Sequence, residues 1–242
     1  DLTWCIDPLD GTTNYSHGYP FFGTSIGLVY KNKPIIGAIS VPYLSELYSA
    51  CIGLGSFCND INLKVSSPSN LSDSLLVTGF AYDRFEIEDN NYAEFCYLTH
   101  KTRGVRRGGA AAVDLAFVAA GKVDGYWERG LEVWDLAAGA IIVKEAGGTI
   151  SDYPSGEFNL SSGRILACSP SIEKELKKEL DNVSPFNKNL YTYKPINIKM
   201  TDIKEIKLVD VRNNSNIINS LNNIYKLWGY EEVSPSFINT LE

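Results

Sequence analysis

The sequence predicts a layered α/β or α+β domain, in which strands and helices alternate around a shared core. Two observations lead to this prediction. Short runs of apolar and β-branched residues, typical of strands, recur from residue 4 to residue 167. Two stretches of mostly small residues, 110–120 and 135–146, stand between such runs and are typical of helices that end at a glycine. The hydrophobic content of 44% is enough for a sizeable core.

The first predicted elements are strands. Residues 4–6 are apolar and predict a buried strand that runs into a turn, with a helix or loop beginning near Gly11. Residues 22–30 and 34–41 are rich in small and β-branched residues, and the polar residues between these two runs predict a hairpin. Further strands are predicted over residues 47–50 and 75–78.

The second half of the domain alternates between helices and strands. Residues 110–120 predict a helix that ends at Gly121, and residues 123–127 predict a strand. Residues 135–146 predict a helix that is closed by two glycines. The last predicted elements are strands over 149–152 and 164–167 and a helix over 171–180 with Ser171 as its cap.

The composition changes at the end of the predicted domain, which covers residues 1–182. Residues 183–199 are rich in Asn, Lys, Tyr and Pro and predict a linker. Residues 200–242 form a separate segment, in which apolar residues recur near helical spacing. Residue 1 is Asp and the only methionine is Met200, so we expect the sequence to begin inside a longer protein.

Charge and cysteine content exclude several classes of protein. The net charge of −7 argues against a general attraction to nucleic acid or to an anionic membrane. The five cysteines are odd in number and include no CxxC pair, so neither a zinc cluster nor a disulfide framework is expected. The sequence has no run of about 18 apolar residues and no charged-then-apolar leader. We therefore expect a cytoplasmic protein without a membrane segment.

The strongest chemical pattern is DPLDGTTN, which begins at Asp7. Asp7 and Asp10 follow an apolar strand, and in a turn both carboxylates and the Leu9 carbonyl can face one point. Hard oxygen ligands of this kind suit Mg²⁺. Gly11 lets the backbone approach a ligand, and the free N–H groups of Gly11 and Thr12 at a helix start can bind phosphate. A capped turn is the alternative interpretation.

A second acidic pattern is WDLAAG, which begins at Trp134. Asp135 opens a predicted helix of small residues that lets neighbouring elements pack closely. By itself the pattern is typical of a helix N-cap, which contributes about 1 kcal/mol. Together with Asp7 and Asp10, Asp135 is a candidate third carboxylate of a two-metal site.

These patterns resemble those of the inositol monophosphatase family. WCIDPLDGTTNY (residues 4–15) is similar to the first signature of the family, and WDLAAGAIIVKEAGG (134–148) is similar to the second. GVRRGGAAAVDLAFVAAGKVDGYWE (104–128) lies between them at the expected distance. The resemblance covers about residues 1–180, and it implies a layered αβαβα sandwich that lacks its N-terminal part in this sequence.

The resemblance also implies an activity and the residues that perform it. The implied reaction is Li⁺-sensitive hydrolysis of a phosphate monoester with two or three Mg²⁺ ions, usually in a homodimer. It implies direct, in-line attack by a metal-activated water, without a covalent phosphoenzyme. The implied ion ligands are Asp7, the Leu9 carbonyl, Asp10 and Asp135, and Thr12 would help to position the water. The implied substrate contacts are Gly11, Thr12, Gly109, Ala110, Ala111, Glu128 and Asp135.

Without the resemblance, three of the charged residues can be interpreted as surface residues with no role in the site. Glu128 is then equally well interpreted as a solvated surface residue. Arg106 and Arg107 are most simply interpreted as surface ion-pair partners, and we do not place them in the site.

The chain departs from the family pattern at both ends. The family has a Glu-Glu motif and an earlier Asp before the first signature, and this sequence contains neither, so we expect an incomplete metal site and a partly exposed core. Residues 200–242 resemble the start of a histidyl-tRNA-synthetase-like regulatory subunit of ATP phosphoribosyltransferase. A tail specific to this protein is the alternative interpretation.

Several functions remain open on these grounds. A small phosphorylated molecule is the expected partner, with inositol 1-phosphate as the first candidate. Histidinol phosphate is an alternative because of the resemblance of the last segment, and a bisphosphate nucleotide or NADP is not excluded. A non-catalytic binding protein on the same scaffold is the alternative from another functional class.

Overall fold

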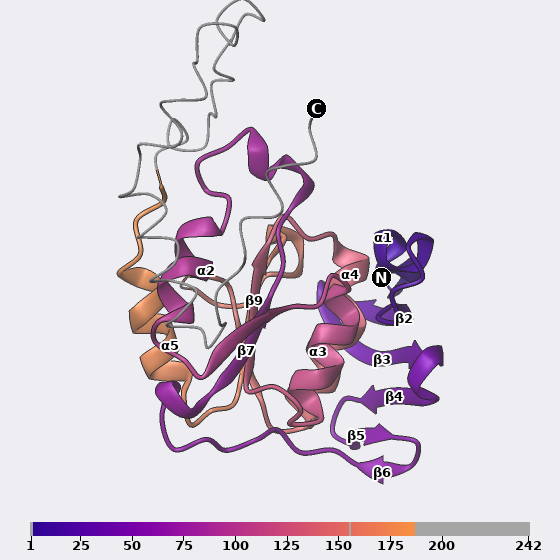
Figure 1. Ribbon diagram of the computed structural model, residues 1–242. Helices are drawn as coiled ribbons and strands as arrows, with labels where there is room; N and C mark the ends of the chain where they lie inside the picture. The colour runs from indigo at the N-terminus through magenta and orange to yellow at the C-terminus, as the bar shows by residue number, and fades with distance from the viewer. Residues whose placement is uncertain (1, 155, 187–242) are drawn as a thin grey trace, which may run out of the picture. The chain divides into compact units, whose positions relative to one another are not determined.

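Strands and helices stack in four layers: a six-stranded sheet, two helices, a five-stranded sheet and two further helices (Figure 1). The computed structural model describes residues 2–154 and 156–186. These residues form four of the five layers that the sequence analysis expects. The predicted linker beyond residue 186 and the segment 200–242, with its resemblance, lie outside the described residues.

The first sheet is antiparallel, and its strands are hydrogen-bonded in chain order. Residues 11–22 join β1 to β2, and shorter connections join the later strands, so strands that are consecutive in sequence are neighbours in the sheet. The predicted hairpin is the pair β2–β3. The strands are β1 (Leu2–Asp10), β2 (Gly23–Tyr30), β3 (Lys33–Val41), β4 (Glu46–Cys51), β5 (Gly55–Cys58) and β6 (Ile61–Asn62).

The second sheet is mixed, with the order β10–β11–β9–β7–β8. Strand β7 is parallel to both of its neighbours, and the other pairs are antiparallel. Parallel neighbours need crossover connections, and helices α2 (Tyr92–Thr99) and α3 (Ala111–Ala119) lie in these connections. The strands are β7 (Leu75–Thr78), β8 (Gly104–Arg107), β9 (Gly125–Arg129), β10 (Thr149–Ser151) and β11 (Arg164–Cys168).

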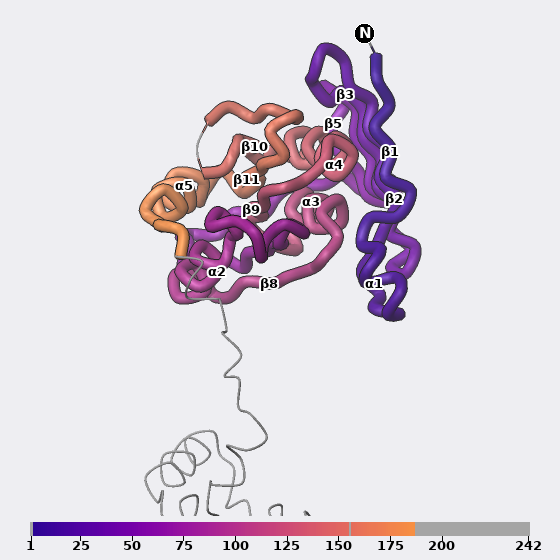
Figure 2. The backbone as a smooth tube through the Cα atoms, turned by 90° about the horizontal axis from the view of Figure 1, so that it is seen from above, coloured from indigo at the N-terminus to yellow at the C-terminus, as the bar shows by residue number. Residues whose placement is uncertain are grey.

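Four helices form the remaining two layers. Helices α3 (Ala111–Ala119) and α4 (Val133–Glu145) lie between the two sheets and contact both (Figures 1 and 2). Helices α2 (Tyr92–Thr99) and α5 (Glu173–Asp181) cover the other face of the second sheet. A short helix, α1 (Thr12–Ser16), follows β1. Within the described residues, no helix combines the length and apolarity that crossing a membrane requires.

Two glycines let α4 lie directly against the first sheet. A Cβ atom at Gly27 would lie 2.6 Å from the Cβ of Ala137, and one at Gly37 would lie 2.5 Å from the Ala138 carbonyl oxygen. Any side chain at either glycine would therefore push the helix outward. The contact sets the position of the first turn of α4, which carries Asp135.

The outer face of the first sheet is open. Trp4 and Ile6 are 60% and 53% exposed, whereas Cys5 between them is 8% exposed. The prediction of a buried strand over residues 4–6 is therefore wrong for two of its three residues. Side chains of a strand alternate between the two faces, and the described residues cover only the face toward α4. This strand also continues to Asp10, beyond its predicted end.

The predicted cap of the last helix is also wrong. Helix α5 begins at Glu173, with Ile172 as its N-cap residue and without a side-chain cap. The Ser171 hydroxyl instead donates a hydrogen bond to the Pro68 carbonyl oxygen at 2.8 Å. Sequence patterns also missed β5, β6, β8 and α2, because these elements are short and lack a clear apolar period.

We expect Gly27→Ala to lower the free energy of unfolding by roughly 1–3 kcal/mol, because the added methyl group overlaps α4. Urea unfolding of the two proteins measures the difference. Gly104→Ala is the matched control, since its methyl group would meet the end of the Arg106 side chain at 3.1 Å and lie in ordinary contact with Leu75 at 3.9 Å. Equal losses from the two substitutions would contradict the role of the glycine in helix packing.

Candidate active site

Three carboxylates meet where the end of β1 approaches the first turn of α4. One oxygen atom from each of Asp7, Asp10 and Asp135 lies within 4.8 Å of the other two. Asp10 is buried, and Asp7 and Asp135 are half-buried. The pattern that begins at Asp7 and the pattern that contains Asp135 are far apart in sequence, and the packing of α4 on the first sheet brings them together.

The turn after Asp7 gives the chain the shape that the site needs. The pairing of β1 with β2 shifts register between Asp7 and Asp10, so the strand bends there. The Leu9 amide donates a hydrogen bond to the Asp7 carboxylate at 2.9 Å, and the exposed Thr12 hydroxyl donates to the Leu9 carbonyl at 3.0 Å. Gly11 has a φ of 82°, a left-handed conformation that favours glycine.

Asp10 is held as a buried carboxylate at the start of α3. It is 7% exposed, and its carboxylate accepts a hydrogen bond from the Ala112 amide at 2.8 Å. Burial raises the pKa of Asp10 to about 7, the Ala112 amide opposes this rise, and the charges of Asp135 and Asp7 add to it. The site therefore disfavours its own negative charge unless a cation is present.

Asp135 is the third residue of α4 rather than its N-cap. Glu132 is the N-cap residue, and its amide donates to the Asp135 carboxylate at 2.8 Å in a reciprocal capping box. Burial, opposed by the Glu132 amide and assisted by the nearby charge of Asp7, raises the pKa of Asp135 to about 6. The capping and ligand interpretations are compatible, because the same carboxylate caps the helix and faces Asp7.

This arrangement fits a divalent cation with hard ligands. The three carboxylates provide oxygen donors, which Mg²⁺ prefers, and the Leu9 carbonyl in the turn between Asp7 and Asp10 accepts a hydrogen bond from the Thr12 hydroxyl. Burial is the main cause of the raised pKa values of Asp10 and Asp135, and repulsion among the converging carboxylates adds to it. A bound cation would relieve that repulsion.

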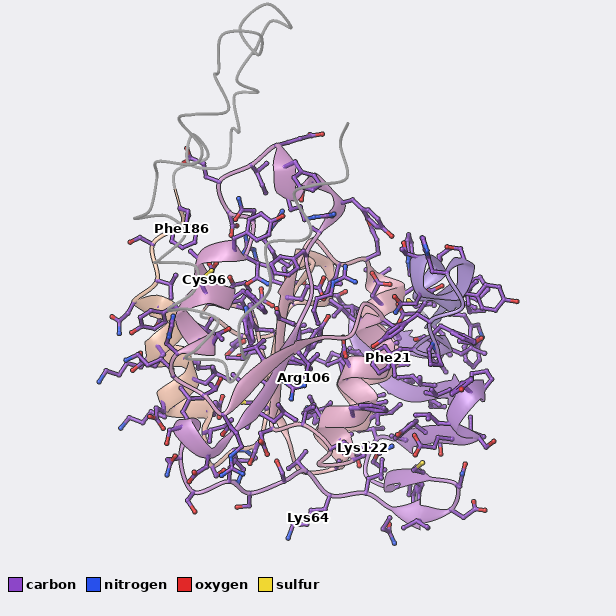
Figure 3. The ribbon with its side chains drawn as sticks, in the orientation of Figure 1. Phe21, Lys64, Cys96, Arg106, Lys122 and Phe186 are labelled. Atoms are coloured by element: carbon purple, nitrogen blue, oxygen red, sulfur yellow. The ribbon has the colours of Figure 1, made fainter. Side chains whose placement is uncertain are left out.

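The predicted phosphate-binding segments lie side by side. A Cβ atom at Gly11 would lie 3.1 Å from the Cβ of Ala110, at the start of α3. Asn14 ties the two segments together, because its side-chain amide donates to the Phe21 carbonyl at 2.7 Å and to the Gly108 carbonyl at 3.0 Å. Phe21, labelled in Figure 3, lies beside α3. Gly109, Ala110 and Ala111 thus lead into the helix start next to Gly11.

Glu128 is buried at the end of β9, which contradicts its interpretation as a surface residue. It is 8% exposed, and it accepts a hydrogen bond from the Tyr126 hydroxyl at 2.5 Å. Burial raises the pKa of Glu128 to about 7, and the Tyr126 hydrogen bond and the Arg107 charge oppose that rise. The charges of Asp135 and Asp10 also act on Glu128, so it belongs to the same electrostatic cluster.

Sequence reasoning missed two charged residues near this cluster. Asp114 is 3% exposed, and burial and the charges of Glu128 and Asp10 raise its pKa well above the usual value. Its position in the otherwise small and apolar helix 110–120 was a usable signal. Arg107 lowers the pKa of both Asp114 and Glu128, so its charge reaches the site. Arg106, its neighbour, is exposed and bonds only its own strand within the described residues (Figure 3).

Comparison with known proteins agrees with the predicted fold. The sequence profile of the inositol monophosphatase family matches residues 1–184. The inositol-1-monophosphatase of Synechocystis sp. is 54% identical over 177 residues, which are 73% of this chain and 62% of that protein. The Nus factor SuhB of Pasteurella multocida is 41% identical over 180 residues, 74% of this chain and 67% of that protein.

A solved structure shares the same architecture. The inositol monophosphatase from Anabaena (Nostoc) sp. superimposes with a TM-score of 0.75 at 55% identity, over 76% of this chain and 75% of its own. This likeness confirms the predicted fold. The chain spans less than two thirds of the length of the Synechocystis protein, so part of that relative has no counterpart in this sequence.

We expect Asp10→Asn to stabilise the metal-free natural protein at pH 8 by roughly 1–2 kcal/mol. The pKa of Asp10 is about 7 in the folded protein and near 3.8 in the unfolded chain. The Asp10 carboxyl therefore makes its full contribution to stability below about pH 4, where it is protonated in both states. This contribution is lost as the pH rises through about 7 and the folded protein must hold a buried charge. The Asn side chain removes the buried charge, and its oxygen can still accept the Ala112 hydrogen bond.

Denaturant unfolding in EDTA at pH 8 and pH 5 tests this expectation. The gain should shrink at pH 5, where the parental carboxyl is protonated. Asp60→Asn is the control, since Asp60 is exposed and its removal should change stability by less than about 0.5 kcal/mol at either pH. An Asp10→Asn protein that is no more stable than the parent at pH 8 would contradict the claim that the buried charge of Asp10 destabilises the metal-free protein.

Proposed function

We propose that this chain, which belongs to the inositol monophosphatase family, carries most of the active site of a Mg²⁺-dependent phosphatase for small phosphate monoesters. The observation that carries the proposal is the convergence of Asp7, Asp10 and Asp135 beside the start of α3. Inositol 1-phosphate is the first candidate substrate, in keeping with the name of the Synechocystis relative.

In this proposal the three carboxylates and the Leu9 carbonyl hold Mg²⁺. When bound, Mg²⁺ would neutralise the phosphate, activate a water for attack and stabilise the leaving oxygen. The Thr12 hydroxyl donates its proton to the Leu9 carbonyl, so its lone pairs are free to accept a hydrogen bond from the water. Thr12 would thereby orient the oxygen that attacks phosphorus in line with the leaving group.

Backbone amides would hold the phosphate. Gly11 and Thr12 form the start of α1, and Gly109–Ala111 leads into α3, so the segments on both sides present amides near the carboxylates. Helix α3 adds the positive end of its dipole, which favours a phosphate anion. Asn14 holds the two segments at a constant separation through its two hydrogen bonds.

Glu128 would bind the alcohol part of the substrate. From the described residues this buried carboxylate receives one hydrogen bond, that of Tyr126, and so has acceptor capacity left for substrate hydroxyls. A polyol such as inositol offers hydroxyl donors for this purpose, whereas a monoester without hydroxyls does not. Glu128 is therefore the proposed determinant of substrate preference.

A second candidate is a binding role on the same scaffold. Relatives named Nus factor SuhB are between 38% and 43% identical to this chain. That name does not mention phosphate release, and catalysis and binding make different demands on Asp10 and Asp135. Catalysis needs both carboxylates, whereas a binding surface does not.

We expect the natural full-length protein to release phosphate from inositol 1-phosphate only when Mg²⁺ is present. Asp10→Asn and Asp135→Asn should each lower turnover by orders of magnitude, because each removes a charged ligand. Phosphate release from inositol 1-phosphate, histidinol phosphate and adenosine bisphosphate ranks the substrates. Asp60→Asn should retain parental activity. If no small monoester is hydrolysed with Mg²⁺, the catalytic proposal fails and the binding role is favoured.

We expect Glu128→Gln to change substrate preference more than Mg²⁺ dependence. The amide can accept fewer hydrogen bonds from substrate hydroxyls, so KM for inositol 1-phosphate should rise roughly tenfold relative to KM for 4-nitrophenyl phosphate. The Mg²⁺ concentration for half-maximal rate should stay within about twofold. An unchanged ratio of the two KM values would contradict the assigned role.

A further inference from the structure

Asn91 occupies the N-cap position of α2 and does not cap the helix. Its backbone has a φ of 70°, in the left-handed region, and its side chain makes no capping hydrogen bond. Asn is usually favoured at this position because its side chain accepts a bond from the helix amides. Here the side chain is completely buried and points instead toward the ends of β7 and β9. Helix capping therefore does not explain the presence of an asparagine side chain at position 91.

All the hydrogen-bonding groups of this side-chain amide are used. Its nitrogen donates to the Thr78 hydroxyl at 2.8 Å and to the Gly79 carbonyl at 2.7 Å. Its oxygen accepts from the indole N–H of Trp127 at 2.6 Å. A reversed amide would place its oxygen against the Gly79 carbonyl and its nitrogen against the indole N–H, so only one orientation satisfies the partners.

The partners of Asn91 are the immediate neighbours of the Glu128 carboxylate. Thr78 pairs with Trp127 across the parallel strands, and its hydroxyl donates to the Trp127 carbonyl at 2.5 Å. Glu128 follows Trp127 in β9. Its carboxylate lies against the Gly79 backbone so closely that a Cβ atom there would come within 2.1 Å of it.

Side chains on the two faces of β9 link Asn91, on one face of the second sheet, to Glu128 on the opposite face. Trp127 belongs to the core beneath α2 and α5, whereas Tyr126 belongs to the core around α3 and α4. Glu128 shares the face of Tyr126, because side chains alternate along a strand. From behind the sheet, Asn91 therefore holds the Gly79 carbonyl and the Trp127 indole directly, and the Trp127 carbonyl through the Thr78 hydroxyl, while the Glu128 carboxylate beside them faces the site.

We propose that Asn91 is a positioning residue for Glu128, and that it determines affinity for the hydroxyl-bearing part of the substrate without contacting substrate or metal. This inference rests on the proposed function, because it uses Glu128 as the group that binds substrate hydroxyls. Asn91 ties the ends of β7 and β9 together at the point where Gly79 and Glu128 touch. Loosening this link displaces the carboxylate and leaves Asp7, Asp10 and Asp135 in place.

Asn91→Asp tests the inference with a nearly isosteric change. The acceptor for the Trp127 indole is kept, and an oxygen replaces the donor that faces the Gly79 carbonyl. In the natural full-length protein with Mg²⁺, KM for inositol 1-phosphate should rise about tenfold while kcat stays within about threefold. KM for 4-nitrophenyl phosphate, which has no hydroxyls to bind, should stay within about twofold.

Asn90→Asp is the matched control. Asn90 is also buried and adjacent in sequence, but its side chain bonds the Ile87 carbonyl and the Tyr92 amide rather than the sheet. The control should leave both KM values within about twofold of the parent. A loss of stability common to both variants would lower the amount of folded protein without changing the KM ratio.

A double-mutant cycle separates positioning from general stability. In a Glu128→Gln background, Asn91→Asp should change the KM ratio by less than about twofold, because the group that it positions is already altered. Additive effects, or an equal rise in KM for both substrates, would overturn the inference.

A crystal structure of the Asn91→Asp protein gives a readout that needs no activity. The Glu128 carboxylate should shift against Gly79 while the distances among Asp7, Asp10 and Asp135 stay unchanged. If the parent hydrolyses no monoester, the proposed function fails, and this structure still tests the positioning itself. An unmoved Glu128 would refute it.

Discussion

The close contact of α4 with the first sheet is the constraint on which the site depends. Gly27 and Gly37 remove the side chains that would keep the helix away, so the first turn of α4 reaches the end of β1. Asp135 then faces Asp7 and Asp10, which come from a distant part of the chain. A helix displaced outward by one side chain would separate these carboxylates beyond the reach of a shared ion.

The same convergence of carboxylates lowers the stability of the folded protein when no cation is bound. Burial and mutual repulsion raise the pKa of Asp10 to about 7 and that of Asp135 to about 6. The protein offsets part of this cost with backbone amides, that of Ala112 for Asp10 and that of Glu132 for Asp135. A cluster that is unfavourable alone and favourable with a cation is typical of a functional site.

The site has two halves that come from different layers. The six-stranded sheet and α4 supply the three carboxylates proposed to hold a cation, and β9 of the five-stranded sheet supplies Glu128, which is proposed to bind the substrate alcohol. The start of α3 lies between them. Because separate elements carry the two halves, the proposed role of Asn91 behind the second sheet concerns the Glu128 half and not the three carboxylates.

The sequence alone determined the strand and helix order of most of the domain and the identity of the converging acids. Local patterns sufficed for this, since apolar periods and the DPLDGTTN and WDLAAG patterns are properties of consecutive residues. Only the tertiary structure decided that Trp4 and Ile6 are exposed, that Glu128 is buried, and that Asp114 and Arg107 lie near the acids. Burial and charge–charge distance depend on how layers pack, and no single segment of sequence carries that information.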